Sequence, residues 1–281
     1  MSIKKVLACT LATTAAFATM SFTSCGKDDA LIVYTEAGFA PFEYVDGGKI
    51  VGVDVDIMNL VGESLGKKVK FKSVGFDTII DAVADGKLCD VGAAGISVTE
   101  ERKAKVDFST EYYTANLYVI YPANEADKYV ATMDDNVKGV FWGAMAEDVI
   151  AVQEGTTADL FLSDELEDGG ALGNTNATPK RFDKLAFGVE DIGLNSDVLI
   201  IDELPAKKLI EGNTKLACAP LYYEGYTDEE TNEYIPDEAA VDSYAICVQK
   251  GNTELLNAIN AVLATLGKDG IQALVDKHLD L

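Results

Sequence analysis

Strand and helix patterns alternate along the first third of the chain. Three strands are expected, at residues 31–34, 69–74 and 91–94. Between the first two, residues 55–65 place apolar side chains at helical spacing, and Gly66 is the stop signal. A second helix is expected to begin at residues 75–77 and to end near Gly86. This order predicts an α/β sheet built from strand–helix–strand units.

Polar residues at the ends of these elements predict turns and helix caps. The Asp46-Gly47-Gly48 run is typical of a hairpin turn. Asp54 and Asp56 come at the start of the first helix, so they are expected to cap it and to set the local structure rather than to do acid–base chemistry. Asp77 is expected to cap the second helix.

The rest of the chain continues the same pattern, with two segments that fit it less well. Further strands are expected at residues 106–108, 117–121, 149–152, 197–202, 215–219 and 244–249, and amphipathic helices at 253–266 and 268–279. Residues 124–148 could form a surface hairpin or a helix. Residues 221–240 are acidic and rich in Tyr, and we expect a solvated flap that could overhang a cleft.

The amino terminus has the pattern of an export signal. Lys4 and Lys5 precede a weakly polar apolar stretch at residues 6–20, and residues 22–25 resemble a lipobox that ends in Cys25. The alternative, a membrane span, needs about 20 apolar residues, and this stretch is shorter and interrupted by Thr. We therefore expect a signal peptide over 1–24, lipidation of Cys25 and a tether over 25–30. The protein would then be exported and anchored to the outer face of a bacterial cell membrane by that lipid.

Charge and cysteine content exclude several classes of function. The formal net charge of the 281-residue chain is −24, and no basic cluster is present, which argues against nucleic-acid binding. Cys89, Cys218 and Cys247 lie in apolar runs without metal-ligand spacing. Buried free thiols are the preferred interpretation, and a Cys89–Cys247 disulfide is the alternative.

The run from Gly95 to Tyr113 has the parts of a carboxylate-binding turn. Ser97 and Thr99 follow an apolar strand, and Thr99 is a good N-cap for a short helix that carries Arg102. Free backbone N–H groups, two hydroxyls and one guanidinium are the groups that hold a carboxylate. Without further information, Arg102 would be interpreted as a solvated helix residue.

This run resembles the signature of the polar amino-acid solute-binding proteins, the receptor subunits of ATP-driven (ABC) uptake transporters. The matching residues are Ala94, Gly95, Ile96, Ser97, Thr99, Glu101, Arg102, Lys103, Val106, Asp107, Phe108, Ser109, Tyr112 and Tyr113. The resemblance implies the type II periplasmic-binding-protein fold, with two lobes that are each a mixed sheet flanked by helices, and with a two-strand hinge. The first lobe would comprise 31–112 and 245–281 and the second 113–244, with the hinge near 112–116 and 241–245.

The resemblance also implies a set of ligand-binding residues. Arg102 would bind the α-carboxylate of the ligand, and Asp202, at a strand end, its α-amino group. Phe39 and Phe76 would cover the two faces of its side chain, and Glu36 would meet a polar or cationic side chain. Gly95, Ser97, Thr157 and Gln153 complete the set. The ordinary structural alternatives are core packing for Phe39, a solvated loop for Glu36 and helix caps for Thr157 and Asp202.

The function expected from this resemblance is capture of a free amino acid and its delivery to ABC permease subunits. A polar or cationic amino acid is favoured by Glu36 and by the acidity of the chain, and a monomer without cofactor or metal is expected. One alternative is an enzyme of the same fold, similar to cyclohexadienyl dehydratase, with Glu36, Glu111 or Glu224 as the acid. The other is an extracytoplasmic ligand sensor.

Overall fold

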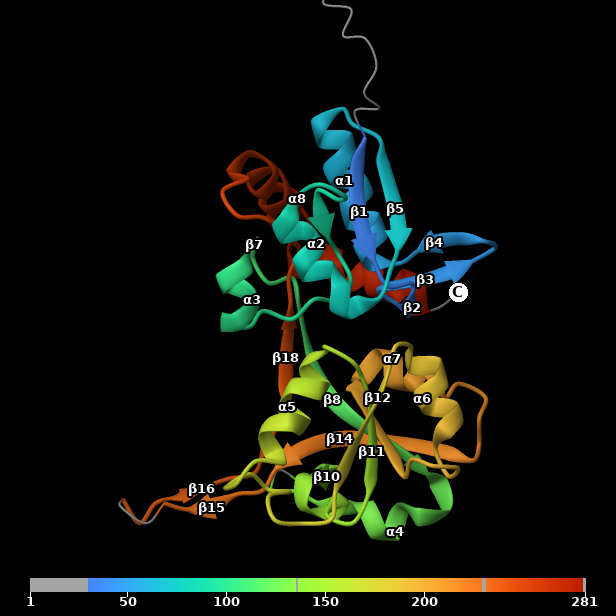
Figure 1. Cartoon of the computed structure of the whole chain (residues 1–281), viewed down its shortest axis with the longest axis vertical. Helices are drawn as coiled ribbons and strands as arrows, with labels where there is room; N and C mark the ends of the chain where they lie inside the picture. The colour runs from blue at the N-terminus through green and yellow to red at the C-terminus, as the bar shows by residue number, and fades with distance from the viewer. Residues whose placement is uncertain (1–29, 135, 229–230, 280–281) are drawn as a thin grey trace, which may run out of the picture.

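The computed structural model describes residues 30–134, 136–228 and 231–279 (Figure 1). The expected signal peptide, Cys25 and nearly all of the expected tether lie outside these ranges. Within them, every helix is too short or too polar to cross a membrane.

The first lobe is built on a five-stranded sheet in the order β5-β1-β6-β19-β7. Its strands are β1 (Leu31–Thr35), β5 (Val69–Ser73), β6 (Val91–Gly92), β7 (Val106–Phe108) and β19 (Cys247–Gln249). Its helices are α1 (Val53–Leu65), α2 (Ile79–Asp85), α3 (Glu100–Lys105) and α8 (Thr253–Leu279), and η1 (Phe76–Thr78) is one 3₁₀ turn. A small sheet of β2 (Gly38–Phe39), β3 (Glu43–Asp46) and β4 (Lys49–Val51) lies beside it. In the five-stranded sheet, β1 pairs in parallel with β5 and with β6, as strand–helix–strand units require.

Most of the predicted helix ends are confirmed. Gly66 and Gly86 end α1 and α2 in the left-handed conformation, and the Thr99 hydroxyl caps α3 by accepting from the Arg102 N–H. The last two predicted helices form α8, which has a non-helical residue at Gly267.

Two predicted caps are wrong. The N-cap residue of α1 is Gly52, without a side-chain cap, and Asp54 instead accepts from the Gly95 N–H (3.0 Å) and the Tyr112 hydroxyl (2.5 Å). Buried polar groups are hydrogen-bonded in proteins, and the donors for Asp54 come from other elements of the fold. Asp77 lies inside η1, whose N-cap is Gly75.

The second lobe contains a nine-stranded mixed sheet with the main order β12-β11-β13-β8-β14-β10-β9. Its strands are β8 (Tyr113–Pro122), β9 (Val130–Thr132), β10 (Lys138–Phe141), β11 (Val149–Gln153), β12 (Thr178–Phe182), β13 (Val198–Asp202), β14 (Leu216–Tyr223), β17 (Glu238–Ala239) and β18 (Val241–Tyr244). Its helices are α4 (Ala126–Tyr129), α5 (Thr157–Glu165), α6 (Leu185–Asp191) and α7 (Glu203–Leu209). The predicted α/β class, with helix-flanked mixed sheets in two lobes, is confirmed.

Two antiparallel strands join the lobes (Figure 1). The first half of β8 pairs with β18, with Tyr113 opposite Tyr244 and Ala115 opposite Asp242. The second half of β8 lies between β13 and β14 in the sheet of the second lobe. One strand therefore forms part of the connection and part of a lobe core.

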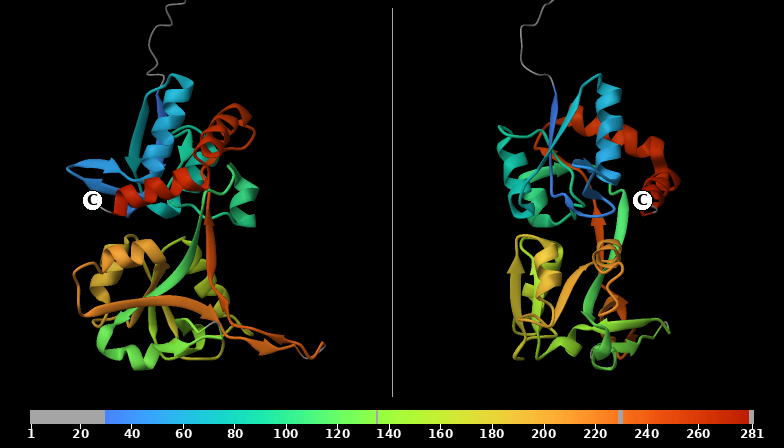
Figure 2. Two further views of the ribbon diagram at one scale, coloured as in Figure 1. Left: turned by 180° about the vertical axis from the view of Figure 1, so that it is seen from behind. Right: turned by 90° about the vertical axis from the view of Figure 1, so that its right-hand side faces the viewer.

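The two segments that the sequence placed less well have opposite surroundings. Residues 124–148 contain α4, β9, β10 and η3 (Trp142–Met145), and Trp142 is 1% exposed in the second-lobe core. They are more than a surface hairpin or a single helix. In the second segment, β15 (Tyr226–Thr227) and β16 (Tyr234–Ile235) form an exposed arm that extends sideways, away from the first lobe (Figure 2). The arm does not overhang the region between the lobes.

The three cysteines in the described ranges are free thiols, with Cys89 and Cys247 buried and Cys218 half-buried. The disulfide alternative is therefore not supported. Burial raises the pKa of Cys89 to about 11 and that of Cys247 to about 12, which keeps both protonated at neutral pH. His278 is buried with a structural role, since it lies 2.9 Å from Asp56 and 3.1 Å from the Tyr44 hydroxyl.

Candidate functional site

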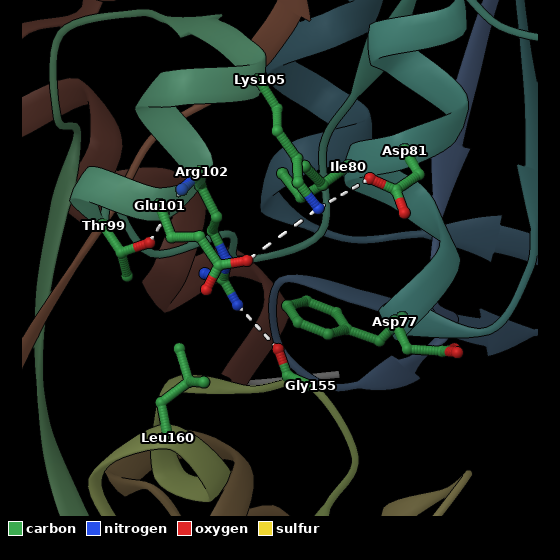
Figure 3. Close-up of a pocket in the computed structure, with 10 residues that line it drawn as sticks. Asp77, Ile80, Asp81, Thr99, Glu101, Arg102, Lys105, Gly155 and Leu160 are labelled. Carbon is green, nitrogen blue, oxygen red and sulfur yellow. Dashed lines mark hydrogen bonds and ion pairs between the residues drawn. The ribbon is translucent and has the colours of Figure 1, made fainter. Parts of the chain in front are cut away.

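A small pocket between the lobes is lined by residues from both of them. Its lining residues are Glu36, Phe39, Glu43, Phe76, Ala94, Gly95, Ser97, Gln153, Thr156, Thr157 and Asp202. A second pocket beside it is lined by Phe76, Arg102 and Gly155, among others (Figure 3). Eight of the nine residues that the sequence proposes for ligand binding line the first pocket, and Arg102 lines the second.

The first-lobe half of the site lies at the carboxyl ends of parallel strands. Glu36 follows β1 directly, and Gly95 and Ser97 follow β6. In open α/β sheets, side chains at these strand ends face the ligand crevice. Gly95 has a φ of +53°, and a Cβ atom there would lie 2.6 Å from Cε1 of Phe39. A glycine at this position therefore allows the Phe39 ring to pack against the turn.

The second-lobe half is the turn between β11 and α5, together with the end of β13. Gln153 ends β11, and its side-chain amide donates to the carbonyl of Asp183 (3.0 Å). Thr156 is the N-cap of α5, so Thr157 occupies the first helical position. The nine-residue helix α5 begins close to the end of β11, and the free N–H groups at a helix start favour an anion. Asp202 ends β13 next to this turn.

Arg102 is buried and contacts both lobes. It is 7% exposed, and its Nη1 donates to the Ser97 carbonyl (2.7 Å) while its Nη2 donates to the Gly155 carbonyl (2.8 Å). Its guanidinium lies 5.5 Å from the centre of the Phe76 ring. Burial lowers the pKa of Arg102, and the nearby Asp242 carboxylate opposes that shift. The interpretation of Arg102 as a solvated helix residue is therefore wrong.

Three buried carboxyl groups line the same pocket. Glu36 and Asp202 are each 6% exposed and Glu43 is fully buried. Burial raises the pKa of Glu36 and Glu43, and burial with the adjacent Asp242 raises that of Asp202 to about 8. Among the described residues, neither Glu43 oxygen has a hydrogen-bond partner, and Asp202 Oδ1 also lacks one. Buried acceptors without donors favour a cationic ligand group at this site.

A fourth carboxylate, Asp242 on β18, lies between the lobes. Ser97 Oγ donates to Asp242 Oδ2 at 2.5 Å, and Thr157 Oγ1 donates to the same oxygen. The two hydroxyl oxygens are 3.1 Å apart. The other oxygen, Oδ1, accepts from the Ser243 N–H at 2.9 Å. Asp242 thus connects both lobes to the strand that joins them.

Sequence reasoning missed Glu43 and Asp242. Glu43 could have been found from the hairpin register, because it lies directly opposite Phe39 and the two side chains share one face. Asp242 carries no motif, and only the three-dimensional pairing of β18 with β8 brings it to Ser97 and Thr157. Glu111 and Glu224, the other acids considered for an enzyme, are exposed and do not line this pocket.

Comparisons with known proteins agree with this geometry. The family of bacterial extracellular solute-binding proteins, family 3, matches residues 31–280. A probable histidine-binding protein of Neisseria gonorrhoeae is 26% identical over 286 residues, covering 96% of this chain and 93% of its own. The amino acid ABC transporter substrate-binding protein AbpA of Streptococcus pneumoniae, solved with L-arginine, has a TM-score of 0.73 at 26% identity, covering 90% and 95% of the two chains.

A third similar structure is that of the ancestral amino acid-binding protein AncCDT-1, described as a precursor of cyclohexadienyl dehydratase. Its TM-score is 0.69 at 26% identity, covering 89% of this chain and 94% of its own. The family match extends over nearly all of the described residues and includes both halves of the site. The chain therefore belongs to family 3 of the bacterial extracellular solute-binding proteins, with the type II periplasmic-binding-protein fold.

Proposed function

We propose that this protein is an extracytoplasmic receptor that binds a free amino acid between its lobes and delivers it to an ABC permease. The observation that carries the proposal is the placement of one buried guanidinium and one buried carboxyl group in two adjacent pockets between the lobes. Arg102 comes from the first lobe and Asp202 from the second. A guanidinium at one side and a carboxyl group at the other, which can give up its proton against an ammonium, match a zwitterion, whose carboxylate and ammonium are fixed in relation to one another.

The two lobes would act on the ligand together. Arg102, with the N–H groups around Ser97 and Thr157, would hold the α-carboxylate, and Asp202 would accept from the α-ammonium. Each contact is weak in an open, hydrated cleft and strengthens when the other lobe excludes water, so binding favours the closed state. The rotation would occur at β8 and β18, between a first lobe of 31–112 and 245–281 and a second lobe of 113–244.

The side-chain end of the pocket supports a cationic amino acid. Glu36 and Glu43 lie there with the Phe39 and Phe76 rings, and the described residues offer Glu43 no donor. A guanidinium, ammonium or imidazolium would supply the missing donors and the missing positive charge. The relatives named above for histidine and arginine are in line with this assignment.

Membrane attachment belongs to the same proposal. Lipidation at Cys25 would hold the receptor near its permease, and a single lipid chain gives only marginal anchoring, so a lipoprotein-type multiple acylation is the form expected. Metabolic labelling with a radioactive fatty acid, with Cys25→Ser as the control, tests this step directly.

The first test is a calorimetric titration of the purified protein with the common amino acids. We expect one cationic amino acid to bind with micromolar affinity, about −8 kcal/mol. Arg102→Ala should lose at least a hundredfold in affinity, because a buried charge-assisted contact to the carboxylate disappears.

Lys103→Ala is the matched control, since Lys103 is adjacent to Arg102 but exposed and pairs only with Glu100 at 2.8 Å among the contacts described. Its affinity should equal that of the unmodified protein. Equal losses in the two variants, or undiminished binding by Arg102→Ala, would contradict the role proposed for Arg102.

An enzyme on the same fold is the second candidate, favoured by one observation. Asp202, with its pKa raised to about 8, retains a proton at neutral pH and could act as a general acid. The similarity to a precursor of cyclohexadienyl dehydratase names the class of reaction to test. Incubation with a prephenate-like cyclic acid, followed by NMR, would show an aromatic product only if this candidate is correct.

A further inference from the structure

The Asp242 carboxylate lies where the receptor would hold the carboxylate of its ligand. It is 7% exposed and accepts hydrogen bonds from Ser97 of the first lobe and Thr157 of the second. These are two of the residues that, with Arg102, would bind an amino-acid carboxylate. In the closed protein an internal carboxylate therefore already occupies their hydroxyl groups.

The Ser97 and Thr157 hydroxyl groups, with Arg102, form a carboxylate seat, and its two hydroxyl groups serve one acceptor at a time. The Ser97 and Thr157 hydroxyl oxygens are 3.1 Å apart and both point at Asp242 Oδ2. Each hydroxyl has a single proton to donate, so a ligand carboxylate cannot accept from either while Asp242 does. The Arg102 guanidinium is engaged in part, since two of its five N–H groups donate to the carbonyls of Ser97 and Gly155.

Charge gives a second reason why the two carboxylates exclude one another. Glu36, Glu43 and Asp202 line the first pocket, Asp242 lies close to Asp202, and among the described residues Arg102 is the one buried Lys or Arg side chain. A further carboxylate placed against Asp242 in this low-dielectric cleft would be repelled. A short Asp side chain on the joining strand can leave the seat by rotation about χ1 or by a small change in the hinge.

We propose that Asp242 is a tethered carboxylate that competes with the carboxylate of the ligand for the seat formed by Ser97, Thr157 and Arg102. This inference rests on the proposed function, because it takes the ligand to be an amino acid. Asp242 has two effects. It holds the lobes together in the absence of ligand, since it bonds to both. It also reduces the apparent affinity in proportion to the fraction of time that the seat is free. A seat occupied nine-tenths of the time lowers affinity about tenfold.

The alternative role for Asp242 makes the opposite prediction. Asp242 is close enough to Asp202 to raise the pKa of that group, so the two could bind the ligand ammonium together. In that case, removal of Asp242 would weaken binding. The sign of the change in affinity therefore separates a competitor from a ligand contact.

The test uses Asp242→Asn, which keeps the shape and removes the charge, and Asp242→Ala, which empties the seat. Glu238→Gln on β17 is the matched control, because it makes the same charge change at an exposed position outside the cleft. Calorimetry measures affinity for the amino acid that binds the unmodified protein. Small-angle X-ray scattering measures the radius of gyration without ligand, and circular dichroism confirms that each variant is folded.

We expect both Asp242 variants to bind about tenfold more tightly, and their ligand-free forms to scatter as more open molecules than the unmodified protein. Glu238→Gln should match the unmodified protein in both measurements. Weaker or unchanged affinity in both Asp242 variants would overturn the competition. If none of the proteins binds an amino acid, the proposed function fails. The scattering measurement still decides whether Asp242 holds the lobes together. An unchanged radius of gyration in the Asp242 variants would overturn that part of the proposal.

Discussion

Gly95 shows how one backbone position controls the shape of the site. Its positive φ is unfavourable for residues with a Cβ atom, and the space that such an atom would need is filled by the Phe39 ring. The same residue also donates its N–H to the buried Asp54. One glycine thus connects the binding turn, an aromatic wall of the pocket and the carboxylate behind it.

We expect Gly95→Ala to lower both the stability and the ligand affinity. The left-handed conformation alone costs about 1–2 kcal/mol, and the clash with Phe39 adds to it. Gly47→Ala is the matched control, because Gly47 has a φ of +54° and a Cβ atom there would meet nothing within 4 Å. Urea denaturation should give a larger loss for Gly95→Ala, while Gly47→Ala should leave affinity unchanged. Equal losses of stability would show that Phe39 yields to the extra methyl group.

The Asp202 carboxyl group makes the stability of the ligand-free protein depend on pH. Its pKa is raised from 3.8 to about 8, first by burial and then by Asp242. The folded protein keeps a proton that the unfolded chain loses above about pH 4. The contribution of this group to stability is therefore full below pH 4 and is lost as the pH rises toward 8, with a slope of at most about 1.4 kcal/mol per pH unit.

Asp202→Asn has no such proton to lose, so its Tm should change less between pH 5 and pH 8 than that of the unmodified protein. Asp46→Asn, at an exposed turn position, serves as the control and should keep the original profile. Thermal melts across this range check the prediction. Parallel profiles for Asp202→Asn and the unmodified protein would mean that Asp202 is hydrated and ionised in the free state.

Three of the nine proposed site residues, Gly95, Ser97 and Arg102, could be predicted because they belong to one local signature. Ser97, Thr99 and Arg102 lie within six positions of one another, so a short run carries their spacing. Asp242 could not be predicted, since its partners are 145 and 85 residues away in the sequence. The sequence also does not show that Asp54 is buried. Its position is typical of a helix cap, but in the fold it accepts hydrogen bonds from Gly95 and Tyr112.

At the scale of elements, the predicted strands and helices agree well where hydrophobic spacing is regular. The helices α1 and α2 end at the predicted glycines, and the break in α8 at Gly267 separates the two predicted amphipathic segments. Residues 124–148 lack a regular period because they are short pieces that pack into an existing sheet. Tyr129, Val140, Trp142 and Met145 belong to the second-lobe core, which the sequence pattern alone does not reveal.

Residues 124–148 and the arm formed by β15 and β16 should respond very differently to truncation of an aromatic residue. Trp142 is 1% exposed and packs in the second-lobe core, so Trp142→Ala should cost about 3–5 kcal/mol of unfolding free energy. Tyr226 is 61% exposed on the arm, so Tyr226→Ala should change stability by less than about 0.5 kcal/mol. Urea denaturation measures both, and a large effect of Tyr226→Ala would mean that the arm packs against another surface.

At the scale of the whole molecule, closure is a matter of which groups meet between the lobes. The hydrogen bond from Arg102 to Gly155 joins the two lobes, so it exists only when they are together. The hydrogen bond from Thr157 to Asp242 also needs the connecting strand β18 in place. The two-lobed fold was predictable from the family signature, whereas the balance of charges inside the closed cleft was not. That balance depends on acids drawn from β3, β13 and β18, which only the folded chain brings together.

The position of β19 in the first-lobe sheet has a consequence for how the chain matures. This strand lies between β6 and β7, so β7 has no neighbour in the sheet until residues 247–249 arrive. The sheet of the second lobe draws its strands from residues 113–244 and can assemble from one uninterrupted stretch. If the chain is exported from its amino end, as the proposed receptor would be, the second lobe is complete while the first still waits for residues 247–249 to cross the membrane. A stalled export intermediate would therefore hold half of the site in a finished lobe and the other half, with Arg102, in an unfinished one.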